Sequence, residues 1–119
     1  MFNKIVITLI ACLVATAAMG TTKNYKTKVL QTAVIEIERG GCMVKLAKAP
    51  AEVGLVCDGP WVHFSCDGSI NSQSEGYQKL EAAQLALVTG SSIKIKIDDD
   101  EGKIIDGHCY ASRIDNFAD

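Results

Sequence analysis

The first twenty residues limit what the rest of this chain can fold into. Lys4 precedes an apolar run at residues 5–14, and a stretch of small residues follows at 15–20. A positive segment, an apolar core and small residues in this order are the signature of a secretory signal peptide. We therefore expect residues 1–20 to be a signal peptide and residues 21–119 to fold outside the cytoplasm, either secreted or in the periplasm.

Two details of this leader stay open. The A-x-A-like pair Ala15 and Ala17 competes with cleavage sites further along, so the mature chain begins somewhere between Ala18 and Thr21. The residues up to Cys12 also resemble the cleavage box of bacterial lipoproteins. The residues after Cys12 are apolar where a lipoprotein begins a polar tether, so we favour plain secretion.

Residues 21–119 are enough for one small domain with a modest core. No later segment approaches the roughly 20 apolar residues that cross a bilayer, so no membrane span is expected. Eleven basic and fourteen acidic residues remain, a net charge of −3, which argues against nucleic acid as a partner. Lys23, Lys26 and Lys28 are the one basic cluster, and we interpret them as part of a flexible lead-in.

Four cysteines remain in the domain: Cys42, Cys57, Cys66 and Cys109. In an oxidising compartment they predict two disulfides, worth about 2–4 kcal/mol each. Of the possible pairings we favour Cys66–Cys109 and Cys42–Cys57, because Cys66 and Cys109 lie on strands expected to be close once the intervening helix folds back. No C-x-x-C pair occurs, so we expect no zinc site, and we predict no other metal or cofactor.

A β-hairpin is predicted from two apolar-rich strands at 34–39 and 42–47. Gly40-Gly41 between them supplies the positive φ angles of a two-residue turn. The register that follows pairs Ile37 with Val44, Ile35 with Leu46, and Glu36 with Lys45.

A second hairpin is expected around Asp58-Gly59-Pro60, between strands at 53–57 and 61–66. Pro60 cannot donate a ladder hydrogen bond, so it belongs at a strand start or a sheet edge. The polar residues that follow Cys66 predict a loop that leads into a helix.

The helix is predicted at about 73–89. Ser72 and Glu75 form a capping box, and Gly90 suits a left-handed C-terminal cap. The spacing of apolar residues predicts a buried face made of Tyr77, Leu80, Ala83 and Leu87. The chain then alternates isoleucine and lysine at 93–97, as in a half-buried strand, and a final strand is expected at 107–114.

The acidic run at 98–101, followed by Gly102, invites comparison with a calcium-binding loop. In the register of an EF-hand, the first and last ligand positions fall on Ile97 and His108, and neither is a carboxylate. We therefore predict an acidic, solvated hairpin turn. Together these elements predict an α+β fold: a small OB-like antiparallel β-barrel or curved sheet with one α-helix, stabilised by disulfides.

Part of the chain resembles a known family. The residues that carry the resemblance are Phe64-Ser65-Cys66-Asp67-Gly68-Ser69-Ile70, Tyr77-Gln78-Lys79-Leu80, Ala83, Ala86-Leu87-Val88-Thr89-Gly90 and Ile93-Lys94-Ile95. They look like the middle of the B subunits of bacterial AB5 toxins of the subtilase-cytotoxin and pertussis-like type. Residues 107–115 are similar to the ending of small exported bacterial proteins. The toxin resemblance implies an OB-like fold, a ring of identical subunits and glycan binding through a shallow pocket.

The sequence favours recognition over catalysis. Neither histidine, His63 or His108, has a spacing to Ser65 or Ser112 that requires a nucleophile and base. Trp61 is the best candidate for ligand contact, because indole stacks on sugar faces, although a lone tryptophan also commonly fills a core. His63 and Tyr110 are further ligand candidates, with a role within the sheet as the alternative.

We thus expect a non-catalytic recognition domain that binds a glycan or an exported protein, as a monomer or a homo-oligomer. The alternative is an accessory or structural envelope protein, or an inhibitor, that acts through protein–protein contacts.

Overall fold

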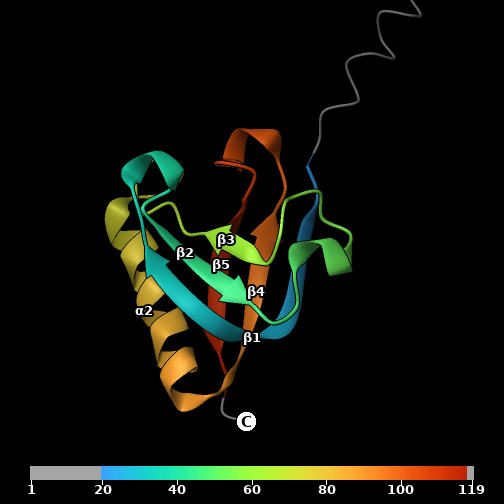
Figure 1. Ribbon diagram of the computed structural model, residues 1–119, viewed down its shortest axis with the longest axis vertical. Helices are drawn as coiled ribbons and strands as arrows, with labels where there is room; N and C mark the ends of the chain where they lie inside the picture. Colours follow the sequence, from blue (N-terminus) through green and yellow to red (C-terminus); the bar gives the residue numbers. More distant parts are fainter. Residues whose placement is uncertain (1–19, 118–119) are drawn as a thin grey trace, which may run out of the picture.

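The structure is a computed structural model that describes residues 20–117 (Figure 1). The predicted signal peptide, apart from Gly20, lies outside the described residues. The described part contains strands β1 (Thr22–Val34), β2 (Cys42–Leu46), β3 (Trp61–His63), β4 (Ser92–Asp98) and β5 (Cys109–Asn116), with one α-helix, α2 (Gln73–Thr89). Three short 3-10 helices lie in the connections: η1 (Ile37–Arg39), η2 (Pro50–Val53) and η3 (Glu101–Lys103).

The five strands close into a ring in the order β1-β2-β3-β5-β4. The β3–β5 pair is parallel and joins only two residue pairs, whereas the other neighbours are antiparallel. With α2 between β3 and β4, this is an irregular, OB-like barrel. The predicted α+β class, with a curved sheet, one helix and disulfides, is confirmed, and the sheet is mixed rather than purely antiparallel.

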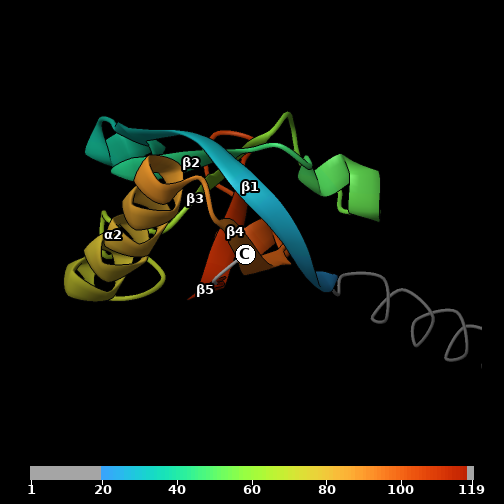
Figure 2. The ribbon, with the colours of Figure 1, turned by 90° about the horizontal axis from the view of Figure 1, so that it is seen from below.

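Strand β1 belongs to both halves of the ring. Its first part, Thr22 to Lys28, pairs with β4, and its second part, Val29 to Val34, pairs with β2 across an irregularity between Val29 and Gln31. Figure 2 shows this long strand curving over the sheet. The predicted flexible lead-in at Lys23, Lys26 and Lys28 is therefore wrong, because these residues form strand pairs, with Lys26 opposite Lys94.

The hairpin between β1 and β2 differs from the prediction. Thr32, not Ile37, lies opposite Val44, and residues 35–41 form a loop that contains η1. Ile37 is 63% exposed. Gly40 takes the left-handed conformation as the C-cap of η1 instead of forming a two-residue turn. The residues of β1 up to Val34 pair with β2. Residues 35–41 therefore form a loop and not a strand of the hairpin.

The first strand of the predicted second hairpin, at 53–57, is not formed. Trp61 begins a strand as expected, but residues 53–57 include the end of η2 and a loop. That loop is tied to the far end of the chain instead, because Asp58 N–H donates to Gly107 O at 2.9 Å. Strand β3 finds its partners in β2 and β5.

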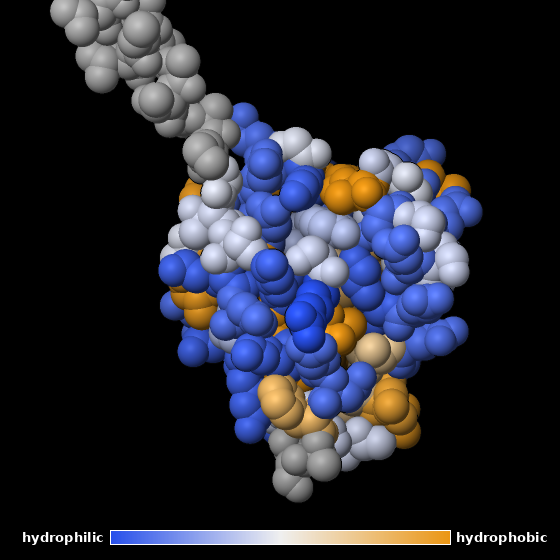
Figure 3. Space-filling model, turned by 180° about the vertical axis from the view of Figure 1, so that it is seen from behind, coloured by the Kyte–Doolittle hydropathy of each residue, from blue (hydrophilic) through white to orange (hydrophobic). Residues whose placement is uncertain are grey.

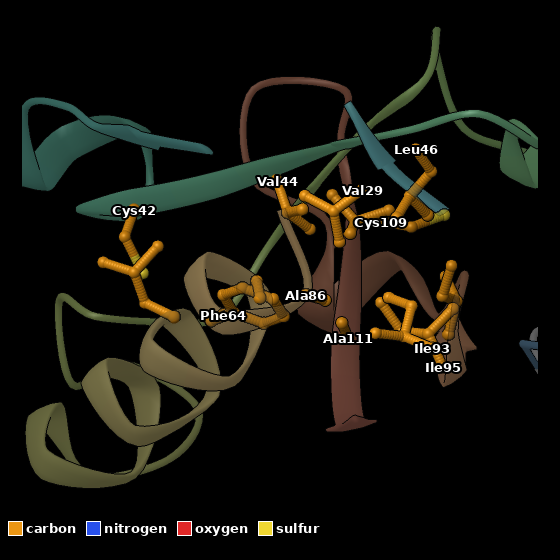
Figure 4. Close-up of a cluster of buried hydrophobic side chains, with 14 of the residues drawn as sticks. Val29, Cys42, Val44, Leu46, Phe64, Ala86, Ile93, Ile95, Cys109 and Ala111 are labelled. Carbon is orange, nitrogen blue, oxygen red and sulfur yellow. The ribbon is translucent and has the colours of Figure 1, made fainter. Parts of the chain in front are cut away.

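Alternating residues of the strands fill the core, and Figure 4 shows many of them between the strands, with Phe64 beside α2. The inward-facing, buried side chains include Cys42, Val44, Leu46, Val62, Phe64, Ile93, Ile95, Ile97, Cys109 and Ala111. The opposite face of β2 and β3 carries Met43, Trp61 and His63. This outer face positions the site described below.

Helix α2 has the predicted bounds and the predicted cap residues, Ser72 and Gly90, and of the predicted capping box the structure gives the bond to the Ser72 side chain. The Ser72 side chain accepts a hydrogen bond from Glu75 N–H at 3.1 Å, and Gly90 is left-handed at φ 71°. Its buried face, however, is made of Gly76, Leu80, Ala83 and Ala86, whereas the predicted face residues Tyr77 and Leu87 are exposed. Small residues turn toward the sheet because the helix backbone approaches β3 and the loop after it closely.

The predicted disulfide pairing is wrong. Cys42 is bonded to Cys66, and Cys57 is bonded to Cys109, with Cα–Cα distances of 5.5 and 5.6 Å. Cys66 lies just beyond β3, which pairs antiparallel with β2, so it reaches the first residue of β2. Cys109 opens β5, where the loop after η2 arrives. These disulfides are typical of proteins that fold in oxidising compartments.

The acidic turn after β4 is more ordered than predicted. Lys103 Nζ pairs with Asp98 Oδ2 at 2.9 Å, and Asp100 Oδ1 accepts from Gly102 N–H at 3.0 Å. Asp99 is buried, with only 7% of its surface exposed, so the turn is not simply solvated. Over residues 20–117, no three histidine, cysteine or acidic side chains are grouped as metal ligands.

The longest helix of the described chain is α2, and neither it nor any other helix there is long and apolar enough to cross a membrane.

Candidate functional site

The outer face of β2 and β3 is hollowed between two loops. The first loop, residues 35–41, joins β1 to β2, and the second, residues 99–108, joins β4 to β5. A cavity of about 260 Å³ lies between them. Its lining mixes apolar and polar side chains: Gln31, Ala33, Ile35, Arg39, Met43, Trp61, Asp106 and His108. We call this the Trp61 cavity.

Strand alternation places Trp61 in this cavity. Val62 is fully buried in the core, so its neighbour Trp61 points to the outer face, where it is partly exposed opposite Lys45. Met43 reaches the same face because Val44 is buried in the core. The floor of the cavity is therefore a partly exposed indole beside a thioether, which offers a flat apolar surface.

The polar wall comes from the tip of the second loop. Asp106 and Gly107 both have positive φ, 53° and 82°, and Ile105 and His108 exchange two backbone hydrogen bonds around them. This tight turn brings Asp106 and His108 to the cavity. The Nδ1 atom of His108 is buried and has no hydrogen-bond partner in the described chain.

Arg39 and Asp106 connect the two loops. Their side chains approach to 3.7 Å, and both are more than half exposed. An exposed ion pair of this kind contributes little to stability, so both groups remain available to other hydrogen-bond partners. A guanidinium, a carboxylate, an amide from Gln31 and an imidazole thus surround the apolar floor.

His63 lies beneath the loops and is not among the residues that line the cavity. Its Nδ1 accepts from Ser65 N–H at 3.1 Å, so Nε2 carries the proton and donates to Lys103 O at 2.8 Å. Burial lowers the pKa of His63 below its ordinary value of 6.5. Gly40 packs against the base of this side chain, because a Cβ there would lie 3.1 Å from His63 Cβ and 3.3 Å from Cγ. His63 therefore fixes both loops from below.

Tyr110 lies in a separate polar cluster next to His63, with ring centroids 5.5 Å apart. Its hydroxyl donates to Asn71 Oδ1 at 2.5 Å and accepts from Lys79 Nζ at 3.0 Å. Lys79 also donates to Asn71 Oδ1 and Ala111 O. Burial lowers the pKa of Lys79 to about 8, and burial raises the pKa of Tyr110.

A second, shallower cavity of about 310 Å³ borders this cluster. It is lined by Glu75, Gln78, Lys79, Ala82, Ser112, Arg113 and Ile114. Since the three donor bonds of Lys79 already go to acceptors within the fold, its ammonium group is committed to joining α2 to β5. The cluster is better suited to holding the helix than to binding a ligand.

Ser65 and His63 do not form a nucleophile–base pair. Ser65 Oγ contacts Asp67 and Ser69, and His63 is bonded to the Ser65 backbone rather than to its hydroxyl. The other ring nitrogen of His63 is engaged by Lys103 O. A base needs a free nitrogen near the hydroxyl that it activates.

Of the three ligand candidates from the sequence, the structure puts Trp61 in the cavity and places His63 and Tyr110 outside it. Sequence reasoning missed Gln31, Arg39, Asp106 and His108 as lining residues. Two signals could have found some of them: Arg39 precedes Gly40-Gly41, and Asp106 precedes Gly107, so both stand at turns that carry exposed loop tips. No protein-family model, curated protein or solved structure matches this chain.

Proposed function

We propose that this protein is an exported, non-catalytic recognition domain that binds carbohydrate in the Trp61 cavity. The observation that carries the proposal is the composition of this cavity: one partly exposed indole with side chains that can donate to and accept from hydroxyl groups. Sugars combine an apolar ring face with a rim of hydroxyls, which such a lining complements.

The position of the cavity supports the proposal by analogy. OB-type barrels commonly bind oligosaccharides or oligonucleotides on the face of their second and third strands, between the loops that follow strands one and four. The Trp61 cavity occupies this face. The net charge of −3 for residues 21–119 favours a neutral ligand over a nucleic acid. This is a likeness of architecture, and the chemistry of the lining carries the choice of ligand.

Export rests on two observations. The sequence of residues 1–20 has the pattern of a signal peptide, and the two disulfides suit an oxidising compartment. The resemblance to AB5 toxin B subunits agrees with an exported glycan-binding domain. A secreted or periplasmic location follows as part of the proposal.

Trp61 itself provides the assay, because it is the sole tryptophan. The oxidised protein, residues 21–119, is screened on a glycan array, and hits are titrated by tryptophan fluorescence and by calorimetry. We expect at least one glycan to change the fluorescence and bind with micromolar to millimolar affinity. We expect Trp61→Ala to weaken calorimetric binding at least tenfold, and Asp106→Asn to weaken it several-fold.

Tyr77→Ala is the matched control, since Tyr77 is an exposed aromatic residue on α2 and does not line the cavity. It should change affinity less than twofold. Unchanged binding by a folded Trp61→Ala protein, or an array without hits, would count against carbohydrate binding in this cavity.

The outer face of α2 favours a second candidate, contact with another protein or a second copy of this chain. Leu85 and Val88 are 57% and 84% exposed, and Leu87 is also exposed. In Figure 3, hydrophobic patches interrupt a mostly hydrophilic surface toward the lower end of the molecule. Exposed apolar groups on one helix are typical of interaction surfaces.

Light scattering of the oxidised protein tests this second candidate. A closed ring in solution that dissociates in the Leu85→Glu/Val88→Glu variant would support an α2 interface. A monomer at all micromolar concentrations would leave contact with a different protein as the only form of this candidate.

A further inference from the structure

Asp99 is a buried carboxylate held by backbone groups. Its Oδ1 accepts from Thr21 N at 2.5 Å, and its Oδ2 accepts from Val56 N at 2.9 Å. Its own N–H donates to Thr21 O at 3.0 Å. Asp99 therefore holds Thr21 at both its nitrogen and its oxygen, one residue before β1 begins.

No basic side chain within residues 20–117 balances this buried charge. The nearest cations along the chain are Lys96, which is exposed on β4, and Lys103, which pairs with Asp98. A buried carboxylate is costly unless it has a cationic partner or enough hydrogen bonds. The nitrogen of Thr21 already donates to Asp99, so a positive charge on this atom would stabilise the buried carboxylate directly.

Gly20 lies against the same turn. A Cβ at Gly20 would be 2.5 Å from Asp100 Cα, closer than real contacts allow, so no other residue fits without a shift of the chain. In the sequence, Ala18 and Gly20 provide small residues at the third and first positions before Thr21. Small residues at these two positions are what a signal-peptide cleavage site requires.

We propose that the bond between Gly20 and Thr21 is the processing site of this chain, and that Asp99 binds the α-ammonium group thereby created. The inference rests on the proposed export. It narrows the start of the mature chain, which the sequence alone left between Ala18 and Thr21, to Thr21.

The chemistry is a hydrolysis by an endopeptidase of the export pathway, with water as the co-reactant. The hydroxyl of water joins the carbonyl carbon of Gly20, which leaves as a carboxylate, and the C–N bond to Thr21 breaks. The freed nitrogen takes up protons and is an ammonium group at neutral pH. The bond from a neutral amide to the Asp99 carboxylate becomes a bond between two opposite charges, which adds Coulomb attraction to the hydrogen bond.

The first experiment determines the N-terminus. The full chain is produced in a bacterial host that exports it to an oxidising compartment, and intact mass and N-terminal sequencing are measured on the exported protein. We expect a start at Thr21. A start at Ala18, Met19 or Gly20, or an uncleaved chain, overturns the assignment of the site.

The second experiment measures the pairing itself. Oxidised chains that begin at Thr21 or at Gly20 are made with and without Asp99→Asn, and their unfolding equilibrium constants are compared. We expect Asp99→Asn to raise the unfolding constant at least tenfold more in the chain that begins at Thr21. An equal effect in both chains overturns the ammonium pairing.

Asp115→Asn is the control, because it breaks an exposed pair with Arg113 and should act equally in both chains. If Asp99→Asn does not fold, acetylating the α-amino group of the Thr21 chain replaces it, since acetylation removes the charge and keeps an N–H. The acetylated chain should unfold more readily by a similar factor, and no change again overturns the pairing. None of these results depends on whether the protein binds carbohydrate.

Discussion

His63 illustrates how a buried polar residue can serve a site without touching its ligand. Both ring nitrogens are bonded within the protein, one to the backbone after β3 and the other to Lys103 in the second loop. Because the neutral ring is the form that fits, protonation opposes folding. The second loop that frames the Trp61 cavity, residues 99–108, is thus coupled to the charge of His63.

This coupling predicts a pH dependence of stability. The folded-state pKa of His63 lies below its ordinary 6.5 because of burial, so its contribution is complete above pH 6.5 and is lost as the pH falls through the folded value. The unfolding free energy should decline below pH 6.5 with at most the slope of one proton, about 1.4 kcal/mol per pH unit. Urea unfolding from pH 7.5 to 4.5 measures it.

His63→Gln is the test variant, since glutamine keeps a donor near Lys103 O but does not titrate. Its stability should vary less over this range than that of the unmodified protein. The pKa values of Asp67 and Asp98 lie below their ordinary 3.8, so protonation of these carboxylates affects stability only at lower pH. A parallel decline in both proteins would contradict the assignment to His63.

Lys79 offers a second measurable property at this scale. Burial lowers its pKa to about 8, an effect that the charge of Glu75 opposes. In ¹³C NMR of Cε-labelled lysines, one resonance should titrate near pH 8. Lys79→Arg should remove this resonance, and Lys94→Arg, an exposed control, should not. A titration of Lys79 close to 10.5 would contradict the prediction.

Strand alternation fixes the direction of a side chain once the side of its neighbour is known. Trp61 faces outward because Val62 is buried in the core, whereas the sequence alone left Trp61 open between ligand contact and a place in the core. The same alternation puts His63 on that outer face, but whether a loop covers it depends on residues 40 and 103, far apart in the chain. The spacing of residues along the sequence does not indicate whether these distant loop residues pack on His63.

At the scale of elements, Gly76 determines how closely α2 can pack. A Cβ at this position would lie 2.9 Å from the backbone of Phe64 and Cys66. Gly76→Ala should therefore destabilise the protein by about 1–3 kcal/mol through overpacking, although alanine favours a helix by about 1 kcal/mol. Urea unfolding measures the change.

Gln84→Ala provides the comparison, because Gln84 is an exposed residue of the same helix. It should change stability by no more than about 0.5 kcal/mol. If Gly76→Ala proved as neutral as Gln84→Ala, the close packing of α2 on the segment after β3 would be refuted.

Local signals predicted α2 well because its limits are set by adjacent residues. Ser72 caps one end and Gly90 the other, whatever the rest of the fold does. The β1–β2 hairpin shows the opposite case. Gly40 and Gly41 do have positive φ as expected, but the register is set by which upstream segment can also pair with β4, and this is a property of the whole ring.

For the whole molecule, the disulfides give the sharpest prediction. Non-reducing peptide mapping should find Cys42 with Cys66 and Cys57 with Cys109. The second bond spans 52 residues and the first 24. Loop-closure entropy then gives about 4 kcal/mol of stability for Cys57–Cys109 and about 3 kcal/mol for Cys42–Cys66. Removing the Cys57–Cys109 bond should therefore cost more stability.

Double Cys→Ala variants, compared by thermal and urea unfolding, check this order. A larger loss for the Cys42 and Cys66 pair would show that packing in the core outweighs the entropy of the unfolded chain. The fold class could be predicted from element order and composition, whereas the disulfide pairing could not, because it depends on β3 joining β2 and β5 at the same time.

The long first strand also has a consequence for the order in which this protein can fold. Thr22 lies opposite Asp98, so the first residues of β1 must wait for nearly the last strand before they are paired. Contacts of such high sequence separation slow folding. A chain that crosses a membrane from its N-terminus would therefore remain open, with its thiols accessible to oxidants, until β4 and β5 have emerged.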